Sequence, residues 1–404
     1  MSITNITENL NKPKRFLARV INAKEGDNGL SHARFTQSVS TNLGAALPFT
    51  RSAADASEKI FLELFEGIIF CYLSVIAGNT LVKNKLFAKS TPTAKAALVL
   101  GCTIVPAAGY ALSYAKNLFT LKVFKKADFS NVVNLDKNKK EDPEHQRKVE
   151  KNAKSSIANA AIAAAAGLAA GAALASFGHK SLKIEKASEI FLNPGKKLYE
   201  HLEKHGTKVS NGVKSFLDSY GSLDFRKASD GTLGLGKGQL ALTVSTAVCG
   251  YFGAAKDRGK LDFLEVATRV PLIALYTIFG SELLDGGLKK YLHNRGKCPA
   301  IVTKGEDGLL KVAALDDLTQ IAKNMSGDYK TNINKVFKDK AAIAMVPWLF
   351  SMLVIGSFIT LMCRIWTKKR YNSGIGNANF AHVASWAPVP RTMSEYAAHC
   401  ARQV

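Results

Sequence analysis

The chain contains 404 residues with a formal net charge of +23, yet its mean hydropathy is zero. A chain this basic reaches a neutral mean only when long apolar segments alternate with charged ones, which favours a membrane protein over an ordinary soluble domain. The six cysteines do not indicate a disulfide framework, because they are scattered and most lie inside apolar segments, where cysteine behaves as a small buried hydrophobe.

Residues 1–60 form a basic N-terminal region without the apolar core of a secretory signal peptide. Basic and apolar side chains interleave between residues 12 and 21, which is typical of a short amphipathic helix. Such a helix would lie on anionic lipid. An ordinary surface helix explains the same pattern.

Six apolar segments follow, and a helix needs about 20 apolar residues to cross a bilayer. They are 61–82, 94–115, 157–177, 239–255, 266–284 and 341–363. The last is the clearest, because it carries no charge and is followed by Arg364, while Trp348 and Trp366 suit the membrane interfaces. We therefore predict an all-α, polytopic integral membrane protein with five or six transmembrane helices.

The segment 157–177 decides between five and six helices. It is rich in alanine, which is nearly neutral for insertion, so it either crosses the membrane or is a helix buried by protein. Its spacing Gly167-x-x-x-Gly171-x-x-x-Ala175 offers a smooth strip for close helix packing. With six helices both ends of the chain share a side, and the basic residues after Cys363 indicate that this side is cytoplasmic.

The polar regions also show organisation. Residues 116–156 read as a charged linker, and 181–220 within the region 178–238 have the periodicity of about three amphipathic helices, broken at Pro194-Gly195 and Gly206. In the region 285–340 we expect a hairpin over 300–313, then a helix to about residue 325. Residues 364–404 form a basic tail without a clear pattern.

A glycine-rich stretch precedes the fourth apolar segment. Gly231, Gly236 and Lys237 match the G-x-x-x-x-G-K pattern that holds phosphates, but Gly238 stands where Ser or Thr would bind magnesium. No buried strand precedes it. A flexible glycine-rich segment that leads into the following helix explains the same residues.

Two histidines provide a candidate metal site. His201 and His205 are four residues apart on one helical face, a spacing that can chelate zinc. No third ligand is evident nearby, and an exposed helix of alternating charge accounts for them equally.

Polar residues near the apolar segments are candidates for an intramembrane site, because an unpaired charge in lipid is costly. They are Glu63, Glu66, Asn79, Arg269 and Glu282. If the first and fifth helices touch, Glu66 and Arg269 would pair. The alternative is that the charged side chains reach water at the interface, and that Asn79 bonds another helix.

No catalytic triad is visible, and we expect no cofactor and lean against an enzyme. The leading hypothesis is a scaffold that contacts anionic lipid head groups through basic amphipathic loops, with protein partners or a second copy meeting its small-residue helix faces. No nucleic-acid partner is expected, because the basic loops lack interleaved aromatics. A transporter or channel is the alternative, and an enzyme acting on lipid a third. A bacterial cytoplasmic membrane is preferred over an organelle.

Overall fold

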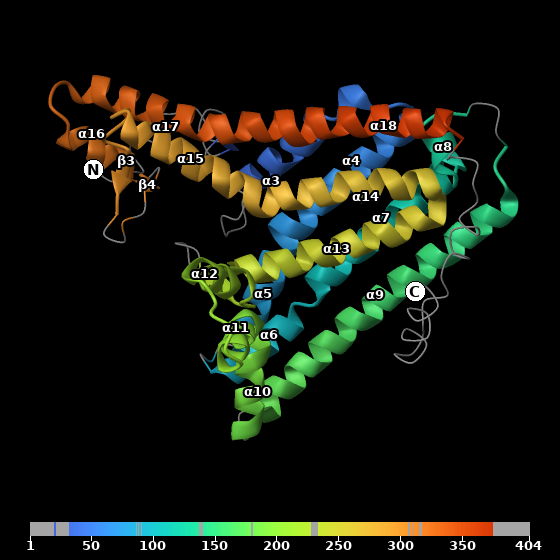
Figure 1. Cartoon of the computed structure of the whole chain (residues 1–404), viewed down its shortest axis with the longest axis horizontal. Coiled ribbons are helices and arrows are strands. Elements are labelled where there is room, and N and C mark those ends of the chain that lie inside the picture. The colour runs from blue at the N-terminus through green and yellow to red at the C-terminus, as the bar shows by residue number, and fades with distance from the viewer. Residues whose placement is uncertain are drawn as a thin grey trace.

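The computed structural model describes residues 20–21 and 32–374, apart from 86, 88, 90, 137–139, 179–180, 228–232, 306–307, 309 and 315–316. Helices make up most of this part of the chain, as predicted, together with two short hairpins (Figure 1). The amphipathic helix expected near the N-terminus and most of the C-terminal tail lie outside the described residues.

The first half of the structure is built from long helices. Its elements are α3 (His32–Val39), η1 (Ser40–Gly44), η2 (Leu47–Phe49), α4 (Ala53–Ile68), η3 (Ile69–Leu73), α5 (Ser74–Lys83), α6 (Pro92–Gly101), α7 (Ile104–Phe124), α8 (Phe129–Val132) and α9 (Pro143–Phe177). The segments α4, η3 and α5 form one helix, in which η3 is a π-helical turn.

The second half adds a polar module, a helical hairpin and a head. The polar module contains α10 (Leu182–Leu192), α11 (Pro194–Lys204), α12 (Asn211–Tyr220) and the hairpin β1 (Phe225–Lys227) with β2 (Leu233–Leu235). Then follow α13 (Lys237–Arg258), α14 (Lys260–Leu275), η5 (Tyr276–Gly280), α15 (Ser281–Asn294), β3 (Val302–Lys304), β4 (Leu310–Val312), α16 (Leu318–Asn324), α17 (Tyr329–Ser351), η7 (Met352–Ile359) and α18 (Thr360–Asn372).

Four helices in the described chain are long and apolar enough to cross a membrane. They are Ala53–Lys83, Pro92–Phe124, Pro143–Phe177 and Tyr329–Asn372, identified by length and composition. The alanine-rich segment is therefore one of the four. The predicted segments 239–255 and 266–284 are not among them. The first lies within α13, and the second comprises most of α14, all of η5 and the start of α15. Their absence fits the polar and charged residues that α13 and α14 carry.

The helices extend beyond their apolar segments, which corrects the prediction of a charged linker over 116–156. α7 continues to Phe124, and α9 begins at Pro143. Asp142 caps α9, since its carboxylate accepts a hydrogen bond from the Glu144 amide at 2.9 Å, and proline is favoured at the first helical position. Charged residues are good helix formers, so the end of an apolar segment does not end the helix.

The three amphipathic pieces predicted over 181–220 are confirmed as α10, α11 and α12, and the hairpin over 300–313 as β3–β4. The helix expected after Asp317 is α16. The hairpin β1–β2 was not predicted. Around β3–β4 a compact head forms its own core, in which Leu292 of α15, Ile301, Leu318 of α16 and Val336 of α17 are buried.

α9 packs against α6 through the small-residue strip. A Cβ added to Gly171 would lie 2.6 Å from the carbonyl oxygen of Ala97 and 2.9 Å from the amide nitrogen of Gly101. Ala175 is buried in the same contact. The backbones of the two helices therefore touch only because no larger side chain stands between them.

We expect Gly171→Leu to lower the free energy of unfolding in detergent by about 1–3 kcal/mol, because the two backbones must separate to admit the side chain. Gly212→Leu on α12 is the matched control, since a Cβ there meets no heavy atom within 4 Å. Equal stability of the two variants would contradict the close contact of α6 and α9.

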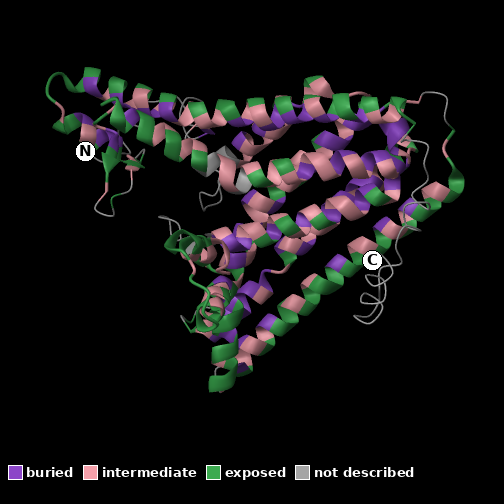
Figure 2. Ribbon diagram, in the orientation of Figure 1, coloured by how far each residue is buried: buried purple, intermediate pink, exposed green. Residues whose placement is uncertain are grey.

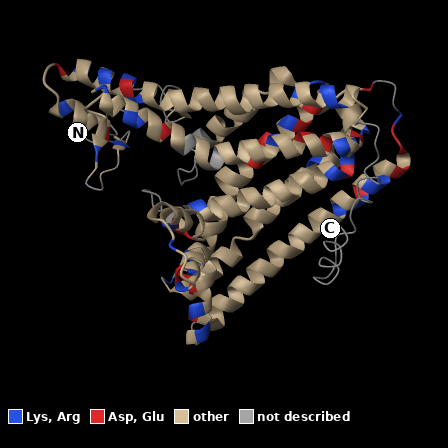
Figure 3. Cartoon of the chain, in the orientation of Figure 1, with Lys and Arg blue, Asp and Glu red and all other residues tan. Residues whose placement is uncertain are grey.

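Charged side chains gather at one end of the bundle. There the first turns of α4, the last turns of α7 and α18, the short helix α8 and the turn between α13 and α14 lie side by side, with blue and red residues concentrated at that end (Figures 1 and 3). The polar module α10–α12 lies away from this end, and the head projects beyond the bundle (Figure 1).

Candidate functional site

Two helices carry charged residues at helical spacing near the charged end of the bundle. On α4 these are Asp55, Glu58 and Lys59, and on α14 they are Asp262, Glu265 and Arg269, while Arg258 is the last residue of α13. Together with Arg51 before α4 and Lys116 on α7, these residues form what we call the charge cluster. Spacings of three and four residues place side chains on one helical face, so the stripes can face each other across the bundle.

Arg51 and Glu265 together connect α4, α14 and α18. Its Nη1 and Nη2 donate hydrogen bonds to the two carboxylate oxygens of Glu265, each at 2.9 Å, and its Nε lies 3.3 Å from Asp55 Oδ2. Thr367 of α18 donates to Glu265 Oε2 at 2.6 Å. This fork-to-fork geometry is the strongest form of a carboxylate–arginine pair.

The ion pair with Arg51 lowers the pKa of Glu265. Burial alone would raise the pKa of Glu265, but the charge and hydrogen bonds of Arg51 outweigh it and lower the pKa to about 2. Burial likewise opposes the charge of Arg51, yet Glu265 and Asp55 raise the pKa of its guanidinium above the usual value. Both groups are therefore charged at neutral pH.

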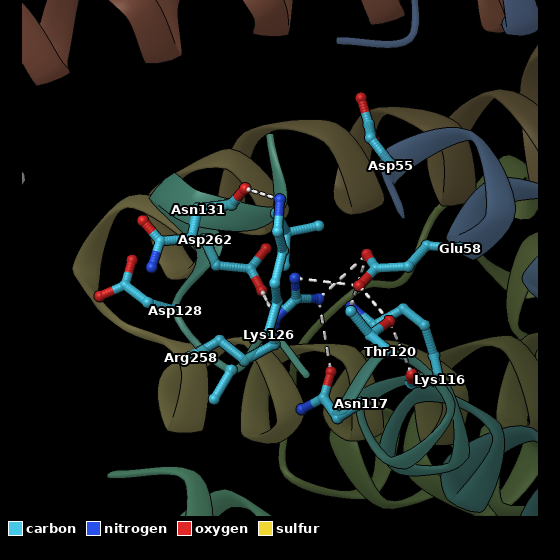
Figure 4. A network of polar contacts seen from close by, with 12 residues as sticks. Asp55, Glu58, Lys116, Asn117, Thr120, Lys126, Asp128, Asn131, Arg258 and Asp262 are labelled. Carbon is cyan, nitrogen blue, oxygen red and sulfur yellow. Dashed lines mark hydrogen bonds and ion pairs between the residues drawn. The ribbon is translucent and has the colours of Figure 1, made fainter. Parts of the chain in front are cut away.

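Arg258 is the second arginine of the charge cluster that contacts two carboxylates. It is 1% exposed, its Nη2 lies 3.0 Å and its Nη1 3.1 Å from the carboxylate of Glu58, and its Nε lies 3.5 Å from Asp262 Oδ2 (Figure 4). Thr120 of α7 donates a second hydrogen bond to Glu58. Burial raises the pKa of Asp262, although Arg258 opposes the shift.

Phe129 of α8 lies close to both arginines. The guanidinium of Arg51 lies 5.3 Å and that of Arg258 5.6 Å from the centre of the Phe129 ring. A cation is attracted to the face of an aromatic ring within about 6 Å. Phe129 is itself buried against Ala54 and Leu261, so α8 closes the charged end of the bundle.

No family model, curated protein or solved structure matches the chain. The charge cluster joins α4, α7, α13, α14 and α18 through charged groups that are removed from water. Breaking one such contact leaves a buried charge without its partner.

The predicted pair of Glu66 and Arg269 does not form an ion pair in the part of the chain that the structure describes. Instead Tyr251 of α13 donates a hydrogen bond to Glu66 at 3.3 Å. Glu63 lies one turn closer to the charge cluster on α4. Arg269 belongs to the cluster and lines a cavity in it.

The other predicted polar residues lie elsewhere. Asn79 donates to the carbonyl of Val75, one turn back on its own helix, at 2.8 Å. Glu282 is in α15, and its side chain lies outside the described residues. Neither belongs to the charge cluster.

The phosphate-loop and metal candidates remain predictions. Gly231 lies outside the described residues, Gly236 precedes α13 in close contact with Asp224, and the ammonium group of Lys237 lies 5.4 Å from the Tyr220 ring centre. The exposed rings of His201 and His205 are 4.4 Å apart. Within the described ranges, no group of three His, Cys, Asp or Glu side chains is placed to hold a metal ion.

Most of the charge cluster was not predicted as a site. Arg51, Glu58, Arg258 and Glu265 lie outside the predicted apolar segments, and they were not considered as site residues from the sequence. The signal that was available is the periodicity of the charged residues on α14, where residues 262, 265 and 269 follow i, i+3 and i+7. A charged stripe of that kind needs either water or an oppositely charged partner.

Proposed function

We propose that the chain is a non-enzymatic membrane protein that serves as a platform, with the polar module α10–α12 lying on a surface of anionic lipid. The observation that carries this proposal is the exposed face of α10. Leu182 is 78% and Ile190 53% exposed, and Lys186 stands between them at helical spacing. An apolar face with lysines is typical of helices that lie in the membrane interface.

The packing of α10 supports this placement. Leu192 is buried against Ala96 and Val99 of α6, which belong to the first turns of the candidate span Pro92–Phe124. α10 therefore lies at the level where that span would enter the membrane. Exposed residues also run along α9 (Figure 2), and Phe177 at its C-terminal end is 68% exposed.

We further propose that six helices cross the membrane, with residues 239–255 of α13 and 266–284 as the fourth and fifth. The support is that these helices pack between candidate spans and run between the same two ends of the bundle (Figure 1). The charge cluster would then lie at one interface, and the polar module and the head on the opposite side of the membrane. A bacterial cytoplasmic membrane is the proposed location.

Lipid contact can be tested with a polarity-sensitive fluorophore attached to Leu182→Cys or Ile190→Cys in a cysteine-free background. In vesicles that contain brominated lipid, we expect bromine to quench both labels, and more strongly when anionic lipid is present. Lys330→Cys, exposed at the start of α17, is the control that lies in the head. Quenching at residues 182 and 190 no stronger than at 330 would refute the proposed surface.

A further inference from the structure

Two glutamates of α4 lie beyond the charge cluster, towards the middle of the helix. Glu63 and Glu66 follow Glu58 by five and eight residues, which is about 8 and 12 Å along the helix axis. Both belong to the candidate span Ala53–Lys83, and both are only partly exposed. With the charged end of the bundle at one membrane interface, as proposed above, these carboxyl groups lie within the hydrocarbon region.

Neither carboxyl group has a cation in contact with it. Among the residues that the structure describes, no nitrogen of Lys, Arg or His lies within 4.0 Å of the carboxyl oxygens of Glu63 or Glu66. Lys59 and Arg269 act on Glu63 only from a greater distance, and both line the cavity of the charge cluster. An ionised carboxylate without a partner is costly in such surroundings, and the group takes up a proton instead.

Both carboxyl groups are bonded within the protein. Tyr251 of α13 donates a hydrogen bond to Glu66 Oε2 at 3.3 Å, and the side chain of Asn42 in η1 forms a hydrogen bond with Glu63. η1 packs against both α4 and η7. These contacts hold the two glutamates away from the interface, where such side chains otherwise reach water.

The amide of Asn42 indicates what Glu63 lacks. Its Oδ1 is buried and has no hydrogen-bond partner among the described residues. An unpaired buried acceptor is costly, and an ionised glutamate cannot supply a donor because its carboxylate only accepts. A protonated Glu63 has one O–H group, and the amide that contacts Glu63 places Oδ1 within its reach.

A water molecule or a metal ion meets these needs less well than a proton. Water would donate to Asn42 but leave two ionised carboxylates one turn apart, which repel each other. Ca²⁺ and Mg²⁺ take about six or more oxygen ligands. Within the described ranges, no group of three His, Cys, Asp or Glu side chains is placed to hold a metal ion. A proton neutralises one carboxylate and creates the missing donor at the same time.

We infer that Glu63 and Glu66 form a proton-binding site that holds one proton at neutral pH. Glu63 carries the proton and donates a hydrogen bond to Asn42 Oδ1, while Glu66 keeps its contact with Tyr251. The proton comes from water and returns to it, so no further reactant is needed. Through this hydrogen bond the proton links η1 to α4. The inference rests on the proposed position of α4 in the membrane, and not on the contact of α10 with lipid.

The test is infrared spectroscopy of the full-length protein in lipid vesicles at neutral pH, where a protonated carboxyl group absorbs apart from ionised carboxylates. We expect such a band in the wild type, with the shift that deuterium exchange gives to a group bearing O–H. The double variant Glu63→Gln with Glu66→Gln is expected to lose it, and to fold, because glutamine resembles neutral glutamic acid. Glu144→Gln, exposed at the start of α9, is the matched control and keeps the band. Any other buried acid, such as Asp262, is present in every sample and cancels in the difference.

Asn42→Leu tests the hydrogen bond itself. The band is expected to remain but to move to higher frequency, because the acid has lost the acceptor of its O–H group. A wild type without the band, a double variant that keeps it in full, or an unmoved band in Asn42→Leu would each overturn the inference. If the double variant does not fold, the spectra of the wild type and Asn42→Leu decide. The band can be absent while labels on α10 are still quenched by brominated lipid, so failure of this site is distinguishable from failure of the proposed lipid contact.

Discussion

Replacing Arg258 by Met is expected to lower the free energy of unfolding by about 3–5 kcal/mol, the usual cost of removing one partner of a buried ion pair. The change leaves Glu58 and Asp262 buried without the guanidinium that contacts both carboxylates. The measurement is denaturation of the purified protein in mixed detergent, followed by circular dichroism. The total free energy of unfolding of a domain is often only about 5–15 kcal/mol. Because the expected loss is a large part of that total, the variant is also expected to accumulate poorly in cells.

Two further variants decide whether the loss comes from the ion pair. In the double variant Glu58→Gln with Arg258→Met, part of the stability should return, because one of the orphaned carboxylates is then neutral. Lys197→Met removes an ion pair with Glu200 in which both side chains are about 40% exposed, and it should have little effect. If Arg258→Met were as mild as Lys197→Met, the cluster would not be a structural contact.

Glu265→Gln is expected to remove an acid-sensitive part of the stability. The pKa of Glu265 is about 2 in the folded protein and 4.5 for an ordinary glutamate. A carboxylate whose pKa is lowered by folding stabilises the protein above the pKa of the unfolded chain, and this contribution disappears as the pH falls toward the folded pKa. For this pKa difference the contribution is roughly 3 kcal/mol.

We therefore expect the difference in the free energy of unfolding between wild type and Glu265→Gln to be constant above about pH 5 and to shrink between pH 4.5 and 2. Asp262, whose pKa is raised, has the opposite dependence, but it is present in both proteins and largely cancels in the difference. Unfolding of both proteins at a series of pH values measures this. A difference that stays constant down to pH 2 would show that Glu265 is not held by Arg51.

The long helices could be predicted from the sequence because an apolar run of about 20 residues has the length of a membrane-spanning helix and few other stable structures. The sequence also predicted α10–α12 and β3–β4, whose periodicity and turn residues are local. Helix ends were predicted less well. Hydropathy marks where a side chain prefers lipid, whereas Asp142 and Pro143 show that capping residues set the start of a helix.

The charge cluster could not be predicted because its contacts are distant in the sequence. Arg51 meets Glu265 across 214 residues, and Arg258 meets Glu58 across 200. The sequence on either side of each residue does not indicate which distant residue is its partner. The expected pair of Glu66 and Arg269 shows the same difficulty, since Glu66 accepts a hydrogen bond from Tyr251 of α13, and the contact of α14 with the residue before the N-cap of α4 is the pair of Glu265 with Arg51.

The helix from Tyr329 to Asn372 extends over 44 residues. At 1.5 Å per residue it measures about 66 Å, roughly twice the thickness of the hydrocarbon core. Its first turns are built into the head through Val336, and near its far end Thr367 is bonded to Glu265. One continuous helix thus connects the head to Glu265, so a movement of the head along the axis of this helix would shift the contacts at the charged end of the bundle.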